Sequence, residues 1–80
     1  MSRSRYGFTR HARTRMRRDE ISEDDVITAI EQPDQTETED NGRLNAWKRL
    51  EGDWLKVVYV VEPRGTIVIT VTRKRKGPTG

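Results

Sequence analysis

The chain of 80 residues contains no cysteine, which excludes disulfide bonds and thiolate metal sites and fits a reducing compartment. It contains one histidine, His11, so a metal would need carboxylate ligands, and Glu37, Glu39 and Asp40 lack the spacing of a calcium loop. The glycines fall in expected turns and form no phosphate-binding loop. No set of serine, histidine and aspartate can be singled out as a triad. We therefore expect no metal and no cofactor.

Apolar residues are also scarce. Hydrophobic residues make up 31% of the chain, and no apolar run approaches the ~20 residues that span a bilayer. The basic N-terminal segment is not followed by an apolar stretch, so we expect no signal peptide and no membrane contact. A chain this short forms one domain and buries only about 60% of its unfolded surface. We expect a single small domain of marginal stability in the cytoplasm of a microbe.

Charge is distributed in three blocks. Residues 1–18 hold seven arginines and no acid, residues 19–40 hold ten acids and no base, and residues 41–80 hold nine bases and three acids. Their charges of +7, −10 and +6 give the net charge of +3. If folding brings the two basic blocks together, a polyanion can bind there. The alternative is that the acidic block neutralises the first basic block within the domain.

The first basic block predicts a helix. Phe8, Ala12 and Met16 recur at a spacing of four residues, which is typical of one helix stripe, and Thr9 is a suitable N-cap. Residues 1–7 are polar and are expected to form a flexible tail.

The acidic block predicts a second helix. Ser22 can cap its start, with Asp25 three residues later as the partner in a capping box, and the acids of the first turn suit the helix dipole. Pro33 ends the helix because proline cannot continue the hydrogen-bond ladder. The expected apolar face consists of Val26, Ala29 and Ile30.

After Pro33 the apolar period changes from near four to two, which predicts strands. Asp40-Asn41-Gly42 indicates a hairpin with a type I′ turn, since Asn-Gly tolerates the positive φ angles that this turn needs. The expected strands are an edge strand around Thr36 and Thr38, then 43–50, 54–62 and 66–72, after which Arg73-Lys74-Arg75-Lys76 leaves the sheet.

These elements predict an α+β fold in which two N-terminal helices pack on one face of a three- to four-stranded antiparallel sheet. The domain is expected at 8–73, with tails at 1–7 and 74–80. Alternation places Leu55, Val57, Tyr59 and Val61, and then Ile67, Ile69 and Val71, on the inward face. The outward face would carry Val58, Val60 and Val68, which indicates either a dimer or partner surface or scattered valines without a role.

The motif His11-Ala12-x-x-Arg15-Met16, followed by the acid-rich segment Ile21–Val26, resembles the family catalogued as domain of unknown function 4258. That family is grouped loosely with the RelE/ParE and BrnT-like toxins, some of which cleave messenger RNA. The resemblance implies a RelE-like domain with helices on an antiparallel sheet, an action on RNA, and an antitoxin-like partner.

The resemblance covers roughly residues 8–73, because the strand segments 57–59 and 67–71 also match the end of the family's domain. One position departs from the family. Its members often carry a base three residues after the methionine, where this chain has Asp19. Arg18 is adjacent, but a shift of one residue turns a side chain by about 100° around a helix.

Cleavage of RNA without a metal needs a group that moves protons and cations that stabilise the phosphate. His11 and Arg15 are four residues apart and share a helix face, so we predict both as catalytic residues. The alternatives are that His11 caps the helix or hydrogen-bonds to the sheet, and that Arg15 pairs with an acid of the second helix, Asp24 or Glu31. The residues predicted to contact nucleic acid are Arg10, Arg18, Arg73 and Arg75.

Three hypotheses follow, and the sequence leaves open whether the domain is an enzyme. The first is a RelE/BrnT-like toxin or metal-independent ribonuclease, and the second is a non-catalytic module that binds nucleic acid. The third is a protein-interaction domain, either a homodimer or bound to an antitoxin-like protein. Trp47 and Trp54 fit either stacking on bases or packing within a hairpin, and we favour packing.

Overall fold

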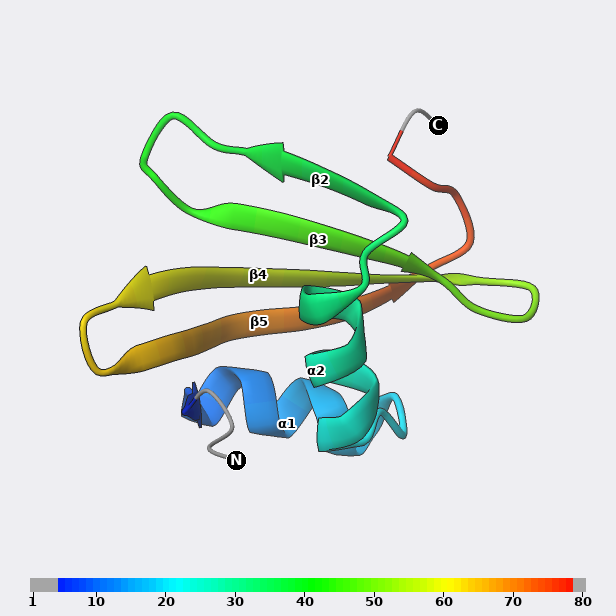
Figure 1. The fold of residues 1–80 in the computed structure, drawn as a ribbon. Helices are drawn as coiled ribbons and strands as arrows, with labels where there is room; N and C mark the ends of the chain where they lie inside the picture. The colour runs from blue at the N-terminus through cyan, green and yellow to red at the C-terminus, as the bar shows by residue number, and fades with distance from the viewer. Residues whose placement is uncertain (1–4, 79–80) are drawn as a thin grey trace.

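The computed structural model describes residues 5–78, so the outer parts of the expected tails, 1–4 and 79–80, lie outside the described residues. The order of elements is β1 (Tyr6–Phe8), α1 (Arg10–Arg18), α2 (Glu23–Glu31), β2 (Gln35–Thr38), β3 (Leu44–Arg49), β4 (Trp54–Glu62) and β5 (Gly65–Lys74). In Figure 1, α2 crosses in front of β4 and β5, and α1 runs along β5. No helix among these residues is long and apolar enough to cross a membrane.

The strands form one sheet in the order β1-β5-β4-β3-β2, in which β1 is parallel to β5 and the other pairs are antiparallel. The α+β class and the two N-terminal helices are confirmed, but the predicted sheet of three to four antiparallel strands is wrong, because the sheet is five-stranded and mixed. The added strand is Tyr6–Phe8, which pairs with Thr66–Val68. Three residues are too few to show the period of a strand.

Thr9 joins the start of α1 to the sheet and is confirmed as its N-cap. Its hydroxyl accepts a hydrogen bond from the Ala12 amide at 3.0 Å and donates one to the Ile69 carbonyl at 2.7 Å. The Thr9 amide also donates to the Val68 carbonyl at 3.0 Å. One residue therefore fixes the helix start against β5.

The capping box of α2 is also confirmed. The Asp25 amide donates to the Ser22 hydroxyl at 3.0 Å, and the Ser22 amide donates to the Asp25 carboxylate at 3.2 Å. The helix ends at Glu31, just before Pro33. Its Val26 and Ala29 are fully buried and Ile30 packs at the edge of the core.

The hairpin between β2 and β3 is confirmed, but its predicted type I′ turn is wrong. A type I′ turn needs positive φ at both central residues, whereas here only Gly42 is left-handed, with φ of +88°. The Gly42 amide donates to the Glu39 carbonyl, and the Arg43 amide donates to the Asn41 side chain at 2.9 Å. Asn41 thus stabilises the turn through its side-chain oxygen rather than through its backbone conformation.

A register shift decides which residues of β5 enter the core. The ladder between β4 and β5 skips Ile69, and an extra residue of this kind reverses the alternation of side chains. Val71 lies in the core as predicted, but Val68 occupies the core position expected for Ile67 and Ile69, which are half-buried. The predicted faces of Ile67, Val68 and Ile69 are therefore wrong.

On β4, Leu55 and Val57 are fully buried and Tyr59 packs against the core, as predicted. Val61 is 67% exposed, so its inward placement is wrong. Figure 1 shows the end of β4 extending past both helices. On the outward face Val58 is only 8% exposed, so the exposed surface of this face is less apolar than expected. A dimer or a protein partner at this face stays a prediction.

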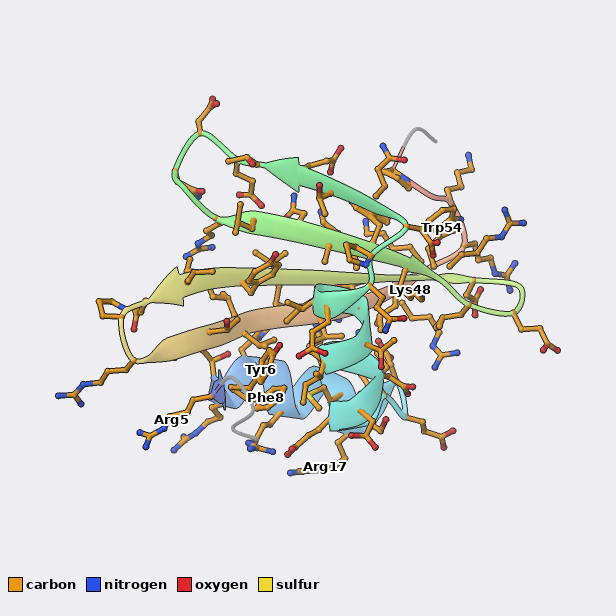
Figure 2. The ribbon with its side chains drawn as sticks, in the orientation of Figure 1. Arg5, Tyr6, Phe8, Arg17, Lys48 and Trp54 are labelled. Carbon is orange, nitrogen blue, oxygen red and sulfur yellow. The ribbon has the colours of Figure 1, made fainter. Side chains whose placement is uncertain are left out.

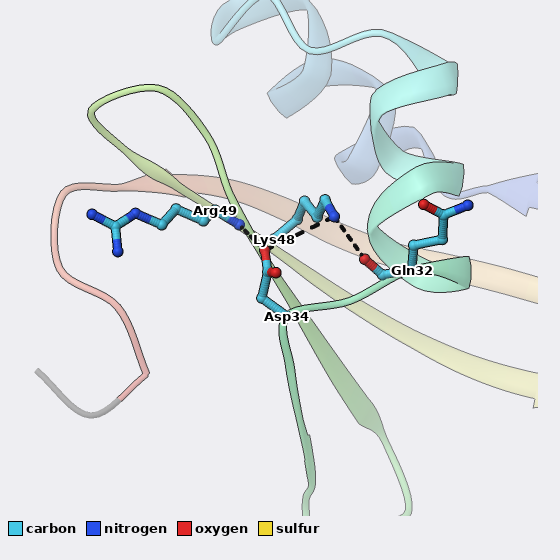
Figure 3. A network of polar contacts seen from close by, with 4 residues as sticks. All are labelled: Gln32, Asp34, Lys48 and Arg49. Carbon is cyan, nitrogen blue, oxygen red and sulfur yellow. Dashed lines mark hydrogen bonds and ion pairs between the residues drawn. The ribbon is translucent and has the colours of Figure 1, made fainter.

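Polar contacts tie the linker after α2 to β3 (Figure 3). The Asp34 carboxylate accepts a hydrogen bond from the Arg49 amide at 2.7 Å and lies 3.9 Å from the Lys48 ammonium. Lys48 also donates to the Gln32 carbonyl at 2.9 Å. These contacts hold the end of α2 against the sheet and so fix how α2 covers the core.

Candidate nucleic-acid interface

The cations of α1 are divided between two flanks of the helix. Arg13 forms an ion pair with Glu23 of α2 at 3.0 Å, and its guanidinium lies 4.9 Å from the centroid of the Phe8 ring. His11 and Arg15 are each two residues from Arg13 and therefore lie about 160° around the helix from it. The flank formed by His11 and Arg15, here called the His11–Arg15 flank, thus faces away from α2.

Arg15 is half-buried and its Nε atom is fully buried. This N–H has no hydrogen-bond partner within residues 5–78. The alternative of an ion pair with Asp24 or Glu31 is wrong, because the acid of α2 that pairs with α1 is Glu23, and it pairs with Arg13. A buried donor without an acceptor costs free energy, and an incoming anion would remove that cost.

His11 is exposed on the same flank, one helical turn before Arg15. In the part of the chain that the structure describes its side chain makes no hydrogen bond, either to the sheet or as a helix cap. Nor does any group of three or more potential ligands there gather as a metal site would require. The imidazole is therefore free to meet a ligand, but no second proton-transfer group contacts it.

The structure separates the four arginines predicted to bind nucleic acid. Arg10 is exposed at the start of α1, three residues before Arg13 and therefore on that residue's side of the helix. Arg18 is exposed too, and its Nε atom lies 3.4 Å from the carboxylate of Asp19. Both lie on the same helix as His11 and Arg15.

Arg73 and Arg75 lie elsewhere. Arg73 belongs to β5, where it pairs with Leu55 and lies 3.7 Å from the Asp53 carboxylate, so the prediction that the chain leaves the sheet there is wrong. Arg75 is exposed beyond the end of β5. Their contacts with nucleic acid stay predictions, and only Arg75 is without a carboxylate partner among the described residues.

Two features were missed by sequence reasoning. Arg17 is exposed on α1 and points away from the sheet (Figure 2), and its place in a run of arginines was the only signal for it. The second feature is a cavity of about 410 Å³ at the end of β5. Its lining comprises Trp47, Lys74, Arg75, Lys76, Gly77 and Pro78.

The two tryptophans pack as predicted for a hairpin. The rings of Trp47 and Trp54 are 6.3 Å apart and nearly perpendicular, an arrangement that aromatic pairs favour. The Lys56 ammonium lies 5.3 Å from the Trp47 ring, and the Arg49 guanidinium 5.8 Å from the Trp54 ring. One cation therefore lies against each ring.

Fold and site together define an α+β domain whose first helix carries His11 and Arg15 on one flank, neither of them paired with a carboxylate within residues 5–78. A comparison with family models matches residues 8–73 to the domain of unknown function DUF4258. The match spans most of the chain, so the protein belongs to the DUF4258 family, as the motif around His11 and Arg15 indicated. The chain has no significant match among curated proteins or among solved structures.

Proposed function

We propose that this protein binds RNA, and that the His11–Arg15 flank of α1 contacts the phosphates. The observation that carries the proposal is the buried Nε of Arg15, a charged donor that lacks an acceptor within residues 5–78. A guanidinium donates two parallel hydrogen bonds to phosphate oxygens, and such charge-assisted bonds are strong. Because this atom is closed to solvent in the structure, phosphate would supply the missing acceptor once the half-buried Arg15 side chain turns outward.

Charge around Arg15 supports the same proposal. His11 is exposed one helical turn before it, and no ion pair within residues 5–78 involves His11 or Arg15. Within residues 5–78 the acidic block pairs with Arg13 through Glu23 and with Arg18 through Asp19, but not with Arg15. The choice of RNA over other polyanions rests on the resemblance to RelE-like and BrnT-like toxins.

The test is the affinity of the whole chain for a fluorescent single-stranded RNA, measured by anisotropy over a range of salt concentrations. Arg15→Gln should weaken binding by roughly tenfold. It should also flatten the slope of log K against log salt by about 0.7, the value for one lost phosphate contact on a single strand. Arg15→Lys keeps the charge but loses the planar guanidinium, so its RNA affinity should lie between those of the unaltered chain and Arg15→Gln.

Arg13→Gln is the matched control because it removes the same charge from the same helix, but from the flank that faces α2. It should change RNA affinity much less than Arg15→Gln. Equal losses in the two variants would show that RNA responds to net charge alone, and the assignment of the His11–Arg15 flank would then be rejected. Far-ultraviolet circular dichroism checks that each variant stays folded.

The second candidate function is a metal-independent ribonuclease, with His11 as the proton-transfer group and Arg15 as the phosphate ligand. The observation that favours it is the exposed imidazole one helical turn from the guanidinium. Purified protein should then cut RNA in the presence of a chelator, and His11→Ala should abolish cleavage while RNA binding persists. If the unaltered protein leaves the RNA uncut, the ribonuclease function is rejected and only the proposed binding function remains.

A further inference from the structure

We infer that the cavity at the end of β5 holds one unpaired nucleotide of the bound RNA, with its phosphate on the lysines and arginine and its base against Trp47. This inference rests on the proposed function but concerns another part of the molecule. The cavity is a shallow depression open to solvent, and its volume of about 410 Å³ falls within the range of small-molecule sites, roughly 300–1,000 Å³.

The cavity lies on the sheet face opposite the helices. Ala46, Val57 and Val71 pair across β3, β4 and β5, and all three lie in the core beneath the helices. Trp47 is the next residue after Ala46, so its side chain projects from the other face. This face carries no helix, and the segment after β5 forms the far wall of the cavity.

The walls of the cavity are fixed by contacts. The Trp47 indole N–H donates to the Glu37 carboxylate at 3.0 Å, and its ring packs edge to face against Trp54. Gly77 lies directly on Trp54: a Cβ at this glycine would stand 2.7 Å from a carbon of the indole. Figure 2 shows Trp54 beside the C-terminal segment. The two tryptophans therefore position the segment that carries the cations.

The cations of the cavity are not neutralised. Lys74, Arg75 and Lys76 are consecutive and exposed, and no carboxylate within residues 5–78 pairs with any of them. The preceding base, Arg73, is the one held by an acid, Asp53. A cavity with three free cations favours an anion.

The tryptophan in the wall of the cavity indicates that the bound anion is a nucleotide. Unpaired bases are recognised by aromatic side chains next to cations that hold the phosphate. Trp47 is 5% exposed, so it contributes a small apolar part of the wall rather than a platform for successive bases. The cavity therefore fits a single base with its phosphate, not a stacked run.

The test uses the fluorescence of the full-length chain, which has two tryptophans. The variant Trp54→Phe leaves Trp47 as the sole indole, and titration with uridine monophosphate should quench it in a saturable way. Lys74→Gln with Arg75→Gln should weaken this binding by about tenfold or more. Gly77→Ala, which pushes the segment away from Trp54, should weaken it as well. Inorganic phosphate should bind more weakly than the nucleotide.

Arg15→Gln is the matched control, because it lowers RNA affinity in the proposed function without touching the cavity. It should leave nucleotide binding unchanged. No saturable binding of uridine monophosphate would overturn the inference, as would equal binding by phosphate and the nucleotide. If Trp54→Phe does not fold, equilibrium dialysis of labelled nucleotide with the unaltered protein gives the same decision. If Arg15→Gln loses RNA binding and the unaltered protein binds no nucleotide, the inference about the cavity is rejected and the proposed function stands.

Discussion

At the scale of single residues, Thr9 joins two elements. Its hydroxyl caps α1 and donates to the carbonyl of Ile69, the residue that the β4–β5 ladder skips. Thr9→Val keeps the shape and removes both hydrogen bonds. We expect a loss of about 1–3 kcal/mol in the free energy of unfolding, measured by urea denaturation. Thr14→Val, on the exposed side of the same helix, is the control and should cost less.

Gly65 is a second residue whose identity the fold requires. Its φ is +146°, and a Cβ there would stand 2.5 Å from the Arg5 carbonyl oxygen, which accepts a hydrogen bond from the Thr66 amide. We expect Gly65→Ala to cost about 1–3 kcal/mol from backbone strain, and more through displacement of β1.

Gly52→Ala separates the two causes, because Gly52 also has positive φ but no atom within 4 Å of the added Cβ. Chemical denaturation should show a larger loss for Gly65→Ala than for Gly52→Ala. Equal losses would mean that the contact between β1 and this turn contributes nothing to stability.

At the scale of elements, the link between α2 and β3 depends on Asp34. Asp34→Ala removes the acceptor of the Arg49 amide and the partner of Lys48. Asp34→Asn keeps an oxygen for the amide but not the charge. We expect the alanine variant to lose about 1 kcal/mol or more and the asparagine variant much less. Thermal unfolding checks this order, and equal losses in the two variants would assign the stabilisation to the ion pair with Lys48, which both remove.

The elements themselves were largely predictable. Helix starts depend on local chemistry, so Thr9 and Ser22 could be identified from their own side chains and near neighbours. Strand β1 and the skipped Ile69 could not be predicted in this way. Strand β1 depends on pairing between segments about sixty residues apart, Tyr6–Phe8 and Thr66–Val68. The skipped Ile69 depends on the register between β4 and β5, which the alternation of side chains along one strand does not reveal. The faces of Ile67 and Val68 were assigned wrongly for the same reason.

At the scale of the whole molecule, ligand binding should be visible as stability. RNA at about one hundred times its dissociation constant should add about 2.7 kcal/mol. For a domain of this size that corresponds to a rise in melting temperature of about 10 °C or more. Differential scanning fluorimetry at fixed RNA concentration should show this rise for the unaltered chain and a smaller one for Arg15→Gln. A rise of the same size in both would contradict the assigned phosphate contact.

By itself the sequence determined the family, the two capped helices, the hairpins and the presence of cations around His11 and Arg15, because each of these depends on neighbours in the chain. Only the tertiary structure decided which cations are free. Glu23 of α2 pairs with Arg13 but not with Arg15, and Asp53 pairs with Arg73 but not with Arg75. The cavity beside Trp47 likewise exists because the segment after β5 packs on Trp54. The physical reason is that neutralisation and enclosure depend on distances across the fold, which spacing along the chain does not encode.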